Sequence, residues 1–146
     1  MIFYIRSILL HINYLRTFSS YFTFNRICIS ALKHYTSKLR QFSDLESVET
    51  LGFRGEALSA LCALCDVEIT TRHGSAEYAF KLKYDHNGKI QSESIIARTI
   101  GTTVSLTNLF NTLPVRRKEF VKNMKKEFNK MCQLLYAYCL VSTGVK

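Results

Sequence analysis

Residues 50–58 read Thr50-Leu51-Gly52-Phe53-Arg54-Gly55-Glu56-Ala57-Leu58, and the remainder of the chain is best understood from them. Two glycines bracket an arginine and lead into residues that favour a helix, which predicts a tight turn that opens a helix. The first amides of a helix have no partner within it, and the helix dipole adds positive potential there. Such a turn binds phosphate, although two glycines at a helix start also serve as an ordinary structural cap.

Three further motifs accompany this turn in a fixed order. Upstream the chain reads Leu32-Lys33-His34-Tyr35-Thr36-Ser37-Lys38-Leu39, and downstream it reads Gly101-Thr102-Thr103-Val104 and then Leu109-Phe110-Asn111-Thr112-Leu113-Pro114-Val115-Arg116-Arg117-Lys118-Glu119-Phe120. With the turn Gly52-Phe53-Arg54-Gly55-Glu56-Ala57-Leu58, they resemble the MutL mismatch-repair family. That family is a branch of the ATPases shared by gyrase, the Hsp90 chaperone and histidine kinases. The resemblance covers about residues 31–146.

Finer details resemble the eukaryotic post-meiotic-segregation type of this family more than the bacterial protein. They are Asp85-His86-Asn87-Gly88-Lys89-Ile90, Leu113-Pro114 and Ala137-Tyr138-Cys139. The resemblance implies a partial gyrase/Hsp90/MutL (Bergerat-type) ATPase fold of the α+β class, an antiparallel sheet backed by helices.

The resemblance also implies roles for single residues. Thr36, Ser37, Lys38, Gly52, Phe53, Arg54 and Gly55 would form the lid and line the ATP phosphates, and Thr102 and Thr103 would stand on the adenine side. The residues alone leave alternatives open. Arg54 either binds phosphate or fastens the lid through a carboxylate such as Asp44 or Glu46. The Thr36 segment also suits a polar loop without a ligand, and threonine simply suits a strand.

Arg116, Arg117 and Lys118 follow Pro114 at the start of an expected helix. They either contact DNA phosphates or form a solvated first turn. Cations at a helix start oppose its dipole at a cost of some tenths of a kcal/mol, which hints at another role.

Residues 1–30 carry none of the family's motifs. The family's catalytic Glu, magnesium-binding Asn and Asp-x-Gly-x-Gly turn should precede the Thr36 segment, yet no acid precedes Asp44 and no glycine precedes Gly52. Arg6, Arg16 and Arg26 also keep each apolar run short of a membrane span. Three interpretations remain: a mitochondrial transit peptide, a helix lying on an anionic membrane, or unrelated residues joined by faulty splicing, which we favour. The expected domains are therefore 1–30, outside the family, and 31–146, a partial ATPase domain.

Composition restricts the chemistry of the chain. It has 146 residues, one domain's length, and a formal charge of +9 that favours a polyanionic partner, although such a helix face is often only solvated. Five cysteines, an odd number, fit a reducing compartment. Cys62-Ala63-Leu64-Cys65 lies within the expected helix without zinc-type partners, so we expect buried thiols. No spacing of histidines and acids indicates a catalytic residue or a metal site.

Periodicity predicts the remaining elements. We expect a ligand-side loop at 31–39, a weak helical turn or lid segment at 41–50 and a helix at 55–64. Four strands at 67–72, 78–84, 89–98 and 102–106 should form an antiparallel meander with one buried face. Asp85-His86-Asn87-Gly88 predicts a hairpin turn centred on Asn-Gly. After Pro114 an apolar stripe should face the sheet: Phe120, Met124, Phe128, Met131, Leu135 and Tyr138. The lysines on the other face should face water: Lys122, Lys125, Lys126 and Lys130.

The resemblance implies ATP and Mg²⁺ as cofactors. It implies a MutL-family heterodimer partner, a MutS-type mismatch-recognition complex and DNA as partners, and nuclear rather than membrane localisation. The family hydrolyses ATP, and some members are also endonucleases. Because a general base and a shielding cation each contribute orders of magnitude in rate, we expect weak or no ATP binding and no turnover from this chain. The alternatives are a non-catalytic basic module that binds nucleic acid or a MutL partner, and a chain that does not fold stably by itself.

Overall fold

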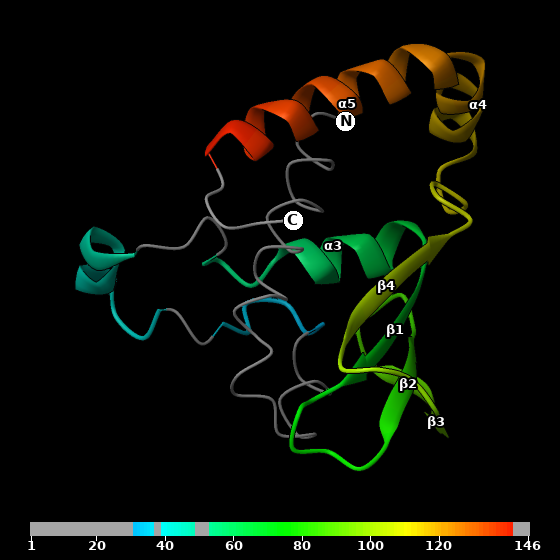
Figure 1. Cartoon of the computed structure of the whole chain (residues 1–146). Coiled ribbons are helices and arrows are strands. Elements are labelled where there is room, and N and C mark those ends of the chain that lie inside the picture. Colours follow the sequence, from blue (N-terminus) through cyan, green and yellow to red (C-terminus); the bar gives the residue numbers. More distant parts are fainter. Residues whose placement is uncertain (1–30, 37–38, 49–52, 142–146) are drawn as a thin grey trace.

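The computed structural model describes residues 31–36, 39–48 and 53–141. The expectations for residues 1–30 and for Ser37, Lys38 and Gly52 lie outside these ranges. The elements follow in the order η2 (Phe42–Ser47), α3 (Ala57–Leu64), β1 (Asp66–Arg72), β2 (Ala79–Tyr84), β3 (Ile90–Ile96), β4 (Gly101–Thr107), α4 (Pro114–Lys122) and α5 (Met124–Val141). The α+β class with an antiparallel sheet and helices is confirmed (Figure 1).

The four strands form one antiparallel sheet in the order β3-β2-β1-β4. The expected meander is therefore wrong in one respect, since β4 pairs with β1 and not with β3. The alternating apolar side chains explain this arrangement: Val104 lies opposite Ile69, and Leu106 lies opposite Val67. The polar run of β3 has exposed residues on both faces and suits an edge, as charged and polar edges resist further pairing.

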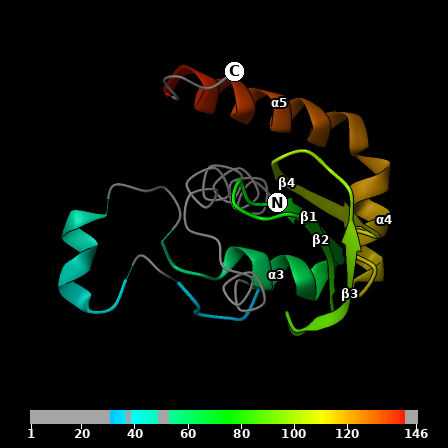
Figure 2. The same ribbon diagram turned by 60° about the horizontal axis from the view of Figure 1, so that its bottom comes forward.

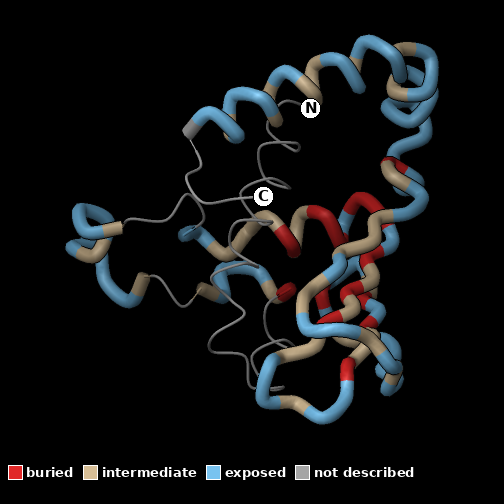
Figure 3. Tube along the Cα trace, in the orientation of Figure 1, coloured by how far each residue is buried: buried red, intermediate tan, exposed pale blue. Residues whose placement is uncertain are grey.

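The core lies between α3 and one face of the sheet (Figure 3). Helix α3 contributes the buried side chains of Leu58, Leu61 and Cys62, and β1 contributes those of Val67 and Ile69. Each fully buried aliphatic side chain of this kind stabilises the fold by roughly 1.5–3 kcal/mol. The helix begins at Ala57 and not at Gly55, because Gly55 has a φ of +66° and Glu56 is the N-cap residue.

The C-terminal region forms two helices, separated at Asn123. Helix α4 is anchored through Phe110, which packs edge-on against Phe120 with a centroid distance of 5.7 Å and whose amide donates to the Leu64 carbonyl at 2.8 Å. Helix α5 then extends away from the sheet (Figures 1 and 2). The expected sheet-facing stripe is wrong for two of its members, since Met124 and Phe128 are 51 % and 58 % exposed.

The lysines of this region largely behave as expected. Lys122, Lys125 and Lys126 are exposed, and Lys130 pairs with Glu127 at 3.1 Å. The helical period did not indicate the break at Asn123, which divides the predicted stripe between α4 and α5. It could not indicate whether the sheet reaches far enough to cover that stripe.

The predicted hairpin joins β2 to β3, with a different centre from the one expected. The amide of Gly88 donates to the Asp85 carbonyl at 3.0 Å, so His86 and Asn87 occupy the central positions. Gly88 has a φ of +79°, and the strand pairing shifts by one residue beside Tyr84. This is a turn followed by a left-handed glycine and a bulge, not a two-residue Asn-Gly turn.

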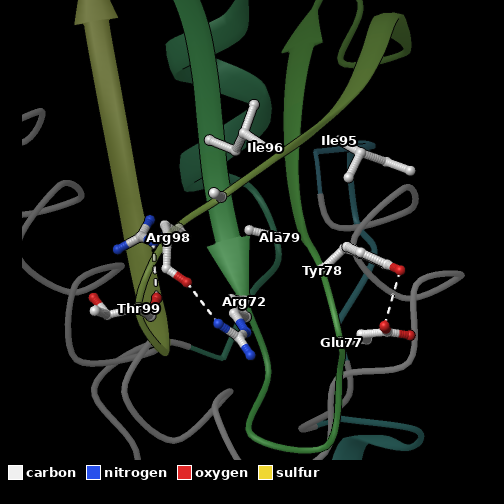
Figure 4. Close-up of a pocket in the computed structure, with 9 residues that line it drawn as sticks. Arg72, Glu77, Tyr78, Ala79, Ile95, Ile96, Arg98 and Thr99 are labelled. Atoms are coloured by element: carbon white, nitrogen blue, oxygen red, sulfur yellow. Dashed lines mark hydrogen bonds between the residues drawn. The ribbon is translucent and has the colours of Figure 1, made fainter.

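The connection from β3 to β4 must cross the end of the sheet, because these strands lie on opposite edges. Two arginines hold it there (Figure 4). Arg72 donates from Nη1 to the Arg98 carbonyl at 2.9 Å, and Arg98 donates from Nη1 to the Thr70 carbonyl. A groove of about 590 Å³ opens beside them, with Tyr78 and Ile95 in its lining. Bonding of both guanidinium groups to backbone carbonyls gives these arginines a structural role.

Gly88 also makes room for the segment at residues 31–36. A Cβ at this position would lie 2.1 Å from the Ala31 carbonyl oxygen. Alanine here is therefore strained by the positive φ and by a backbone clash. We expect Gly88→Ala to lower the free energy of unfolding by more than about 2 kcal/mol, measured by urea denaturation.

Gly74→Ala is the matched control, because its nearest non-neighbour atom would be 3.9 Å away and its φ is not left-handed. It should change stability by less than about 0.5 kcal/mol. Equal effects of the two substitutions would contradict the packing of residues 31–36 on Gly88. Absence of any cooperative transition in the unsubstituted chain would instead support the alternative that it does not fold alone.

Candidate functional site

The described part of the lid consists of Phe53, Arg54 and Gly55, immediately before α3. No carbonyl among the described residues accepts a hydrogen bond from the amide of any of these three residues. Helix α3 receives no side-chain cap at its N-terminus either. Amides without a described partner beside the positive end of a helix dipole are features that suit an oxyanion.

Gly55 fastens the lid to the upstream motif. The amide of His34 donates to the Gly55 carbonyl at 3.1 Å, and a Cβ on Gly55 would lie 2.2 Å from the Tyr35 carbonyl oxygen. With a φ of +66°, this position requires glycine for two separate reasons. Residues 31–36 and the lid are therefore neighbours, although 20 residues separate them in sequence. Thr36 is half-buried at the end of this segment, and Ser37 and Lys38 lie outside the described residues.

Arg54 pairs with Glu56 and not with the carboxylates considered from the sequence. Its Nε lies 3.0 Å from Glu56 Oε2. Asp44 instead accepts hydrogen bonds from the amides of Arg40 and Gln41 at 2.8 and 3.1 Å, at the start of η2. These two bonds hold the pKa of the Asp44 carboxyl below its usual value. Glu46 has no ion pair with any described residue, so neither acid of η2 is the partner of Arg54.

The structure places Thr102 and Thr103 on opposite faces of the sheet. Thr102 lies opposite Thr71 in the β1–β4 register, and their Oγ1 atoms are 2.7 Å apart. Thr71 is buried on the face covered by α3, with Val67 and Ile69. Thr103 lies opposite Thr70 and is exposed. Only Thr102 therefore shares the α3 side of the sheet.

The basic turn after Pro114 is partly occupied by internal contacts. The guanidinium carbon of Arg116 lies 5.8 Å from the centroid of the Phe110 ring, and Arg117 donates to Asn111 Oδ1 at 2.9 Å. Lys118 is exposed and makes no ion pair within the described ranges. Two of the three expected DNA-contacting residues thus also stabilise the loop before α4.

Cys62 in α3 and Cys65, the C-cap residue of that helix, are both buried, as predicted. Burial raises the pKa of the Cys62 thiol to about 12 and that of Cys65 to about 11. Cys65 donates from Sγ to the Leu61 carbonyl. Across residues 31–36, 39–48 and 53–141, no three side chains of the metal-binding types lie together. No helix in these same ranges has the length and apolar character that a membrane span requires.

Sequence reasoning missed His34, Tyr35 and Glu56 as members of the site. Nδ1 of His34 lies 3.2 Å from Glu56 Oε1. The position of Glu56 directly after the lid glycine was visible in the sequence, whereas its partner in a distant loop was not. Only the close approach of the two backbones at Gly55 brings these side chains together.

Comparison with known proteins identifies the family. No protein-family model matches the chain. The chain is 60 % identical to mismatch repair endonuclease PMS2 of Mus musculus over 116 residues, which cover 80 % of the chain and 14 % of that protein. The matched region belongs to the MutL mismatch-repair family. Human PMS2 is 58 % identical over 115 residues, and yeast PMS1 (Saccharomyces cerevisiae) is 46 % identical over 116, each match covering 13 % of the relative.

Solved structures agree with the MutL assignment. The N-terminal domain of a DNA repair protein matches 80 % of the chain, with 39 % identity and a TM-score of 0.64, and 32 % of that domain is covered. The ATPase domain of Aquifex aeolicus MutL, solved with ADP, matches 69 % of the chain with 26 % identity and a TM-score of 0.53, and 39 % of it is covered. The chain therefore spans a small part of its MutL relatives, and what the whole proteins do is a matter of proposal for this chain.

The raised thiol pKa values of this MutL chain make a direct prediction. At pH 8 about one Cys62 or Cys65 in a thousand, or fewer, is a thiolate, so both should resist iodoacetamide in the native state. Cys139 is exposed and serves as the internal control. Peptide mapping by mass spectrometry should show label at Cys139 first. Equally rapid labelling of Cys62 would contradict its burial in the core between α3 and the sheet.

Proposed function

We propose that this chain supplies the phosphate-binding lid of a MutL-type nucleotide site that acts in DNA mismatch repair. The observation that carries the proposal is the lid itself. Three amides without a described partner and the Arg54 guanidinium belong to the residues just before α3. One of these residues is Gly55, where an added Cβ would clash with the backbone of Tyr35. These groups suit the oxygens of a diphosphate or triphosphate. The ADP complex of a related MutL domain supports a nucleotide as the ligand.

The remaining site assignments extend this proposal. Thr36, Ser37 and Lys38 would stand beside the phosphates with Gly52, since the described end of that segment adjoins Gly55. Thr102, on the α3 side of the sheet, is the better adenine-side candidate, and Thr103 is the weaker one. The proposed family part is residues 31–146, which agrees with a match of 116 residues to mouse PMS2.

ATP hydrolysis by this chain alone is not part of the proposal. Both oxygens of Glu56, the acid beside the lid, are engaged by the side chains of His34 and Arg54, and no acid occurs before Asp44 in the sequence. A general base for the attacking water is thus not identified. The described residues also offer no cluster of magnesium ligands, so they do not fit Mg²⁺ by themselves. ATP is the proposed ligand, and Mg²⁺ would accompany it only through groups other than these.

Proposed partners and location follow from the relatives. A MutL-family heterodimer partner, a MutS-type mismatch-recognition complex and DNA are the proposed partners, and the nucleus is the proposed location. Their support is the identity of the chain to mismatch-repair proteins of mouse, human and yeast. Co-purification with a tagged MutL-family partner would test the first of these.

Calorimetry and a phosphate-release assay test the nucleotide proposal. We expect the chain to bind a non-hydrolysable ATP analogue weakly and to release no phosphate above the buffer rate. Arg54→Ala should weaken binding about tenfold, because a charge-assisted bond to phosphate contributes roughly 1.5 kcal/mol. Lys89→Ala removes an exposed cation of the β2–β3 turn and should leave affinity unchanged. Normal turnover, or equal losses in the two variants, would contradict the proposal.

A second candidate function rests on the basic surface of α4 and α5. Exposed cations are concentrated on these helices: Arg116, Arg117, Lys118, Lys122, Lys125 and Lys126. Helix α4 also carries no acid in its first turn, contrary to the usual preference at a helix start. Such a surface suits the phosphate backbone of nucleic acid.

DNA binding at graded salt concentrations tests this second candidate. The affinity should fall steeply with salt and should not respond to ATP. Replacing Lys118, Lys122 and Lys126 with alanine should reduce the slope of log Kd against log salt by about one unit per lost phosphate contact. The control replaces Lys33, Lys83 and Lys89, which are exposed elsewhere. Failure to bind DNA at low salt would dispose of this candidate.

A further inference from the structure

We propose that Glu56 is a positioning residue that holds residues 31–36 and the lid residues Phe53–Gly55 in one phosphate-binding arrangement. The proposal deepens the proposed nucleotide function and rests on it. Its basis is the pair of contacts that the Glu56 carboxylate makes with His34 and Arg54, which come from two separate segments.

Each oxygen of the Glu56 carboxylate has its own partner. Oε1 lies 3.2 Å from Nδ1 of His34, and Oε2 lies 3.0 Å from Nε of Arg54. The carboxylate is only 30 % exposed, whereas the His34 and Arg54 side chains are 68 % and 75 % exposed. A partly shielded acid therefore lies between two solvent-facing nitrogen-bearing side chains, an imidazole and a guanidinium. Without it, nothing among the described residues would orient either side chain.

Glu56 occupies the N-cap position of α3 without capping the helix. Of the two acids, aspartate commonly caps a helix from this position and contributes about 1 kcal/mol, whereas glutamate is not among the preferred capping residues. Here the side chain makes no capping hydrogen bond. The contacts of the carboxylate are with His34 and Arg54 instead.

The backbone at the same place limits how the two segments can move. His34 has a φ of +66°, uncommon for a residue with a side chain, and its amide donates to the Gly55 carbonyl. The backbone bond and the Nδ1 contact both tie the same residue to the lid. His34 is thus held in a left-handed conformation from both its main chain and its side chain.

Arg54 remains able to bind phosphate while it contacts Glu56. Glu56 engages Nε, and the two terminal nitrogens of the guanidinium make no hydrogen bond to any described residue. Because a guanidinium is planar with five N–H donors, a carboxylate on one edge fixes the direction of the other edge. Glu56 would therefore orient Arg54 for a phosphate oxygen.

Charge alone predicts the opposite effect of Glu56 on nucleotide binding. A carboxylate close to a phosphate site repels the ligand, so its neutralisation should strengthen binding. Positioning requires that neutralisation weaken binding. Glu56→Gln separates these alternatives by the sign of the change, because glutamine has nearly the same size.

The experiment uses the whole chain labelled with ¹⁵N, titrated with ADP and separately with adenosine. We expect Glu56→Gln to weaken ADP binding about five- to tenfold and to leave adenosine binding within about twofold, because only the phosphate side is disturbed. In the absence of nucleotide, exchange of the His34 amide with solvent should accelerate. Glu93→Gln removes the same charge on the exposed edge strand β3 and should do neither.

A second variant completes the test. His34→Asn removes the Nδ1 contact with a residue that tolerates a positive φ. Its loss of ADP affinity should not add to that of Glu56→Gln in the double variant, since both act through one interaction.

Several results would overturn the proposal. Tighter ADP binding by Glu56→Gln would make Glu56 a competitor of phosphate, and unchanged binding would give it no role. Equal losses for ADP and adenosine, with a lower melting temperature, would mean that it supports only the fold. If the unsubstituted chain binds neither ligand, the proposed function fails. Glu56 is then judged by His34 amide exchange alone, and unchanged exchange in Glu56→Gln would refute the proposal.

Discussion

The arrangement of the site depends on two positions where a side chain is sterically excluded. At Gly55 and Gly88 an added Cβ would lie 2.2 and 2.1 Å from carbonyl oxygens of residues 31–36, and both glycines have positive φ. The upstream segment can therefore lie against the start of α3 at one end and against the β2–β3 turn at the other. Ala31 is fully buried in consequence and joins the core.

This constraint connects the core to the lid. Helix α3 packs on β1 through its buried leucines, and the β2–β3 turn is tied to the same helix, because His86 Nδ1 donates to the Cys62 carbonyl at 2.9 Å. The close backbone contacts at Gly55 and Gly88 then fix where residues 31–36 lie relative to the core. The lid ends at one of these contact points, Gly55. Anion binding by backbone groups requires amides that are free to donate and a packed core that holds them in place. The lid amides have no described partner, and the contacts at Gly55 join the lid to the core.

Much of this could be predicted from the sequence, for local reasons. Alternation in β1 and β2, the glycine and arginine pattern before α3, and the hairpin at Gly88 all depend on residues close in sequence. The β1–β4 pairing could not be predicted in this way, since it depends on which strand offers the apolar partner for Ile69 and Val67. The path of α5 was mispredicted for a related reason: periodicity identifies a face and not what covers it. The contact of His34 with Glu56 required knowing that Tyr35 passes over Gly55.

The most direct test of the account is a map of the backbone amides that respond to ADP. A ¹H–¹⁵N titration of the whole chain should shift the amides of Phe53, Arg54, Gly55 and Thr36, because phosphate oxygens would accept hydrogen bonds there. The amides of β3, on the far edge of the sheet, should not move. Shifts confined to α4 and α5, or none at the lid up to millimolar ADP, would contradict the assignment of residues 53–55 as a phosphate-binding lid.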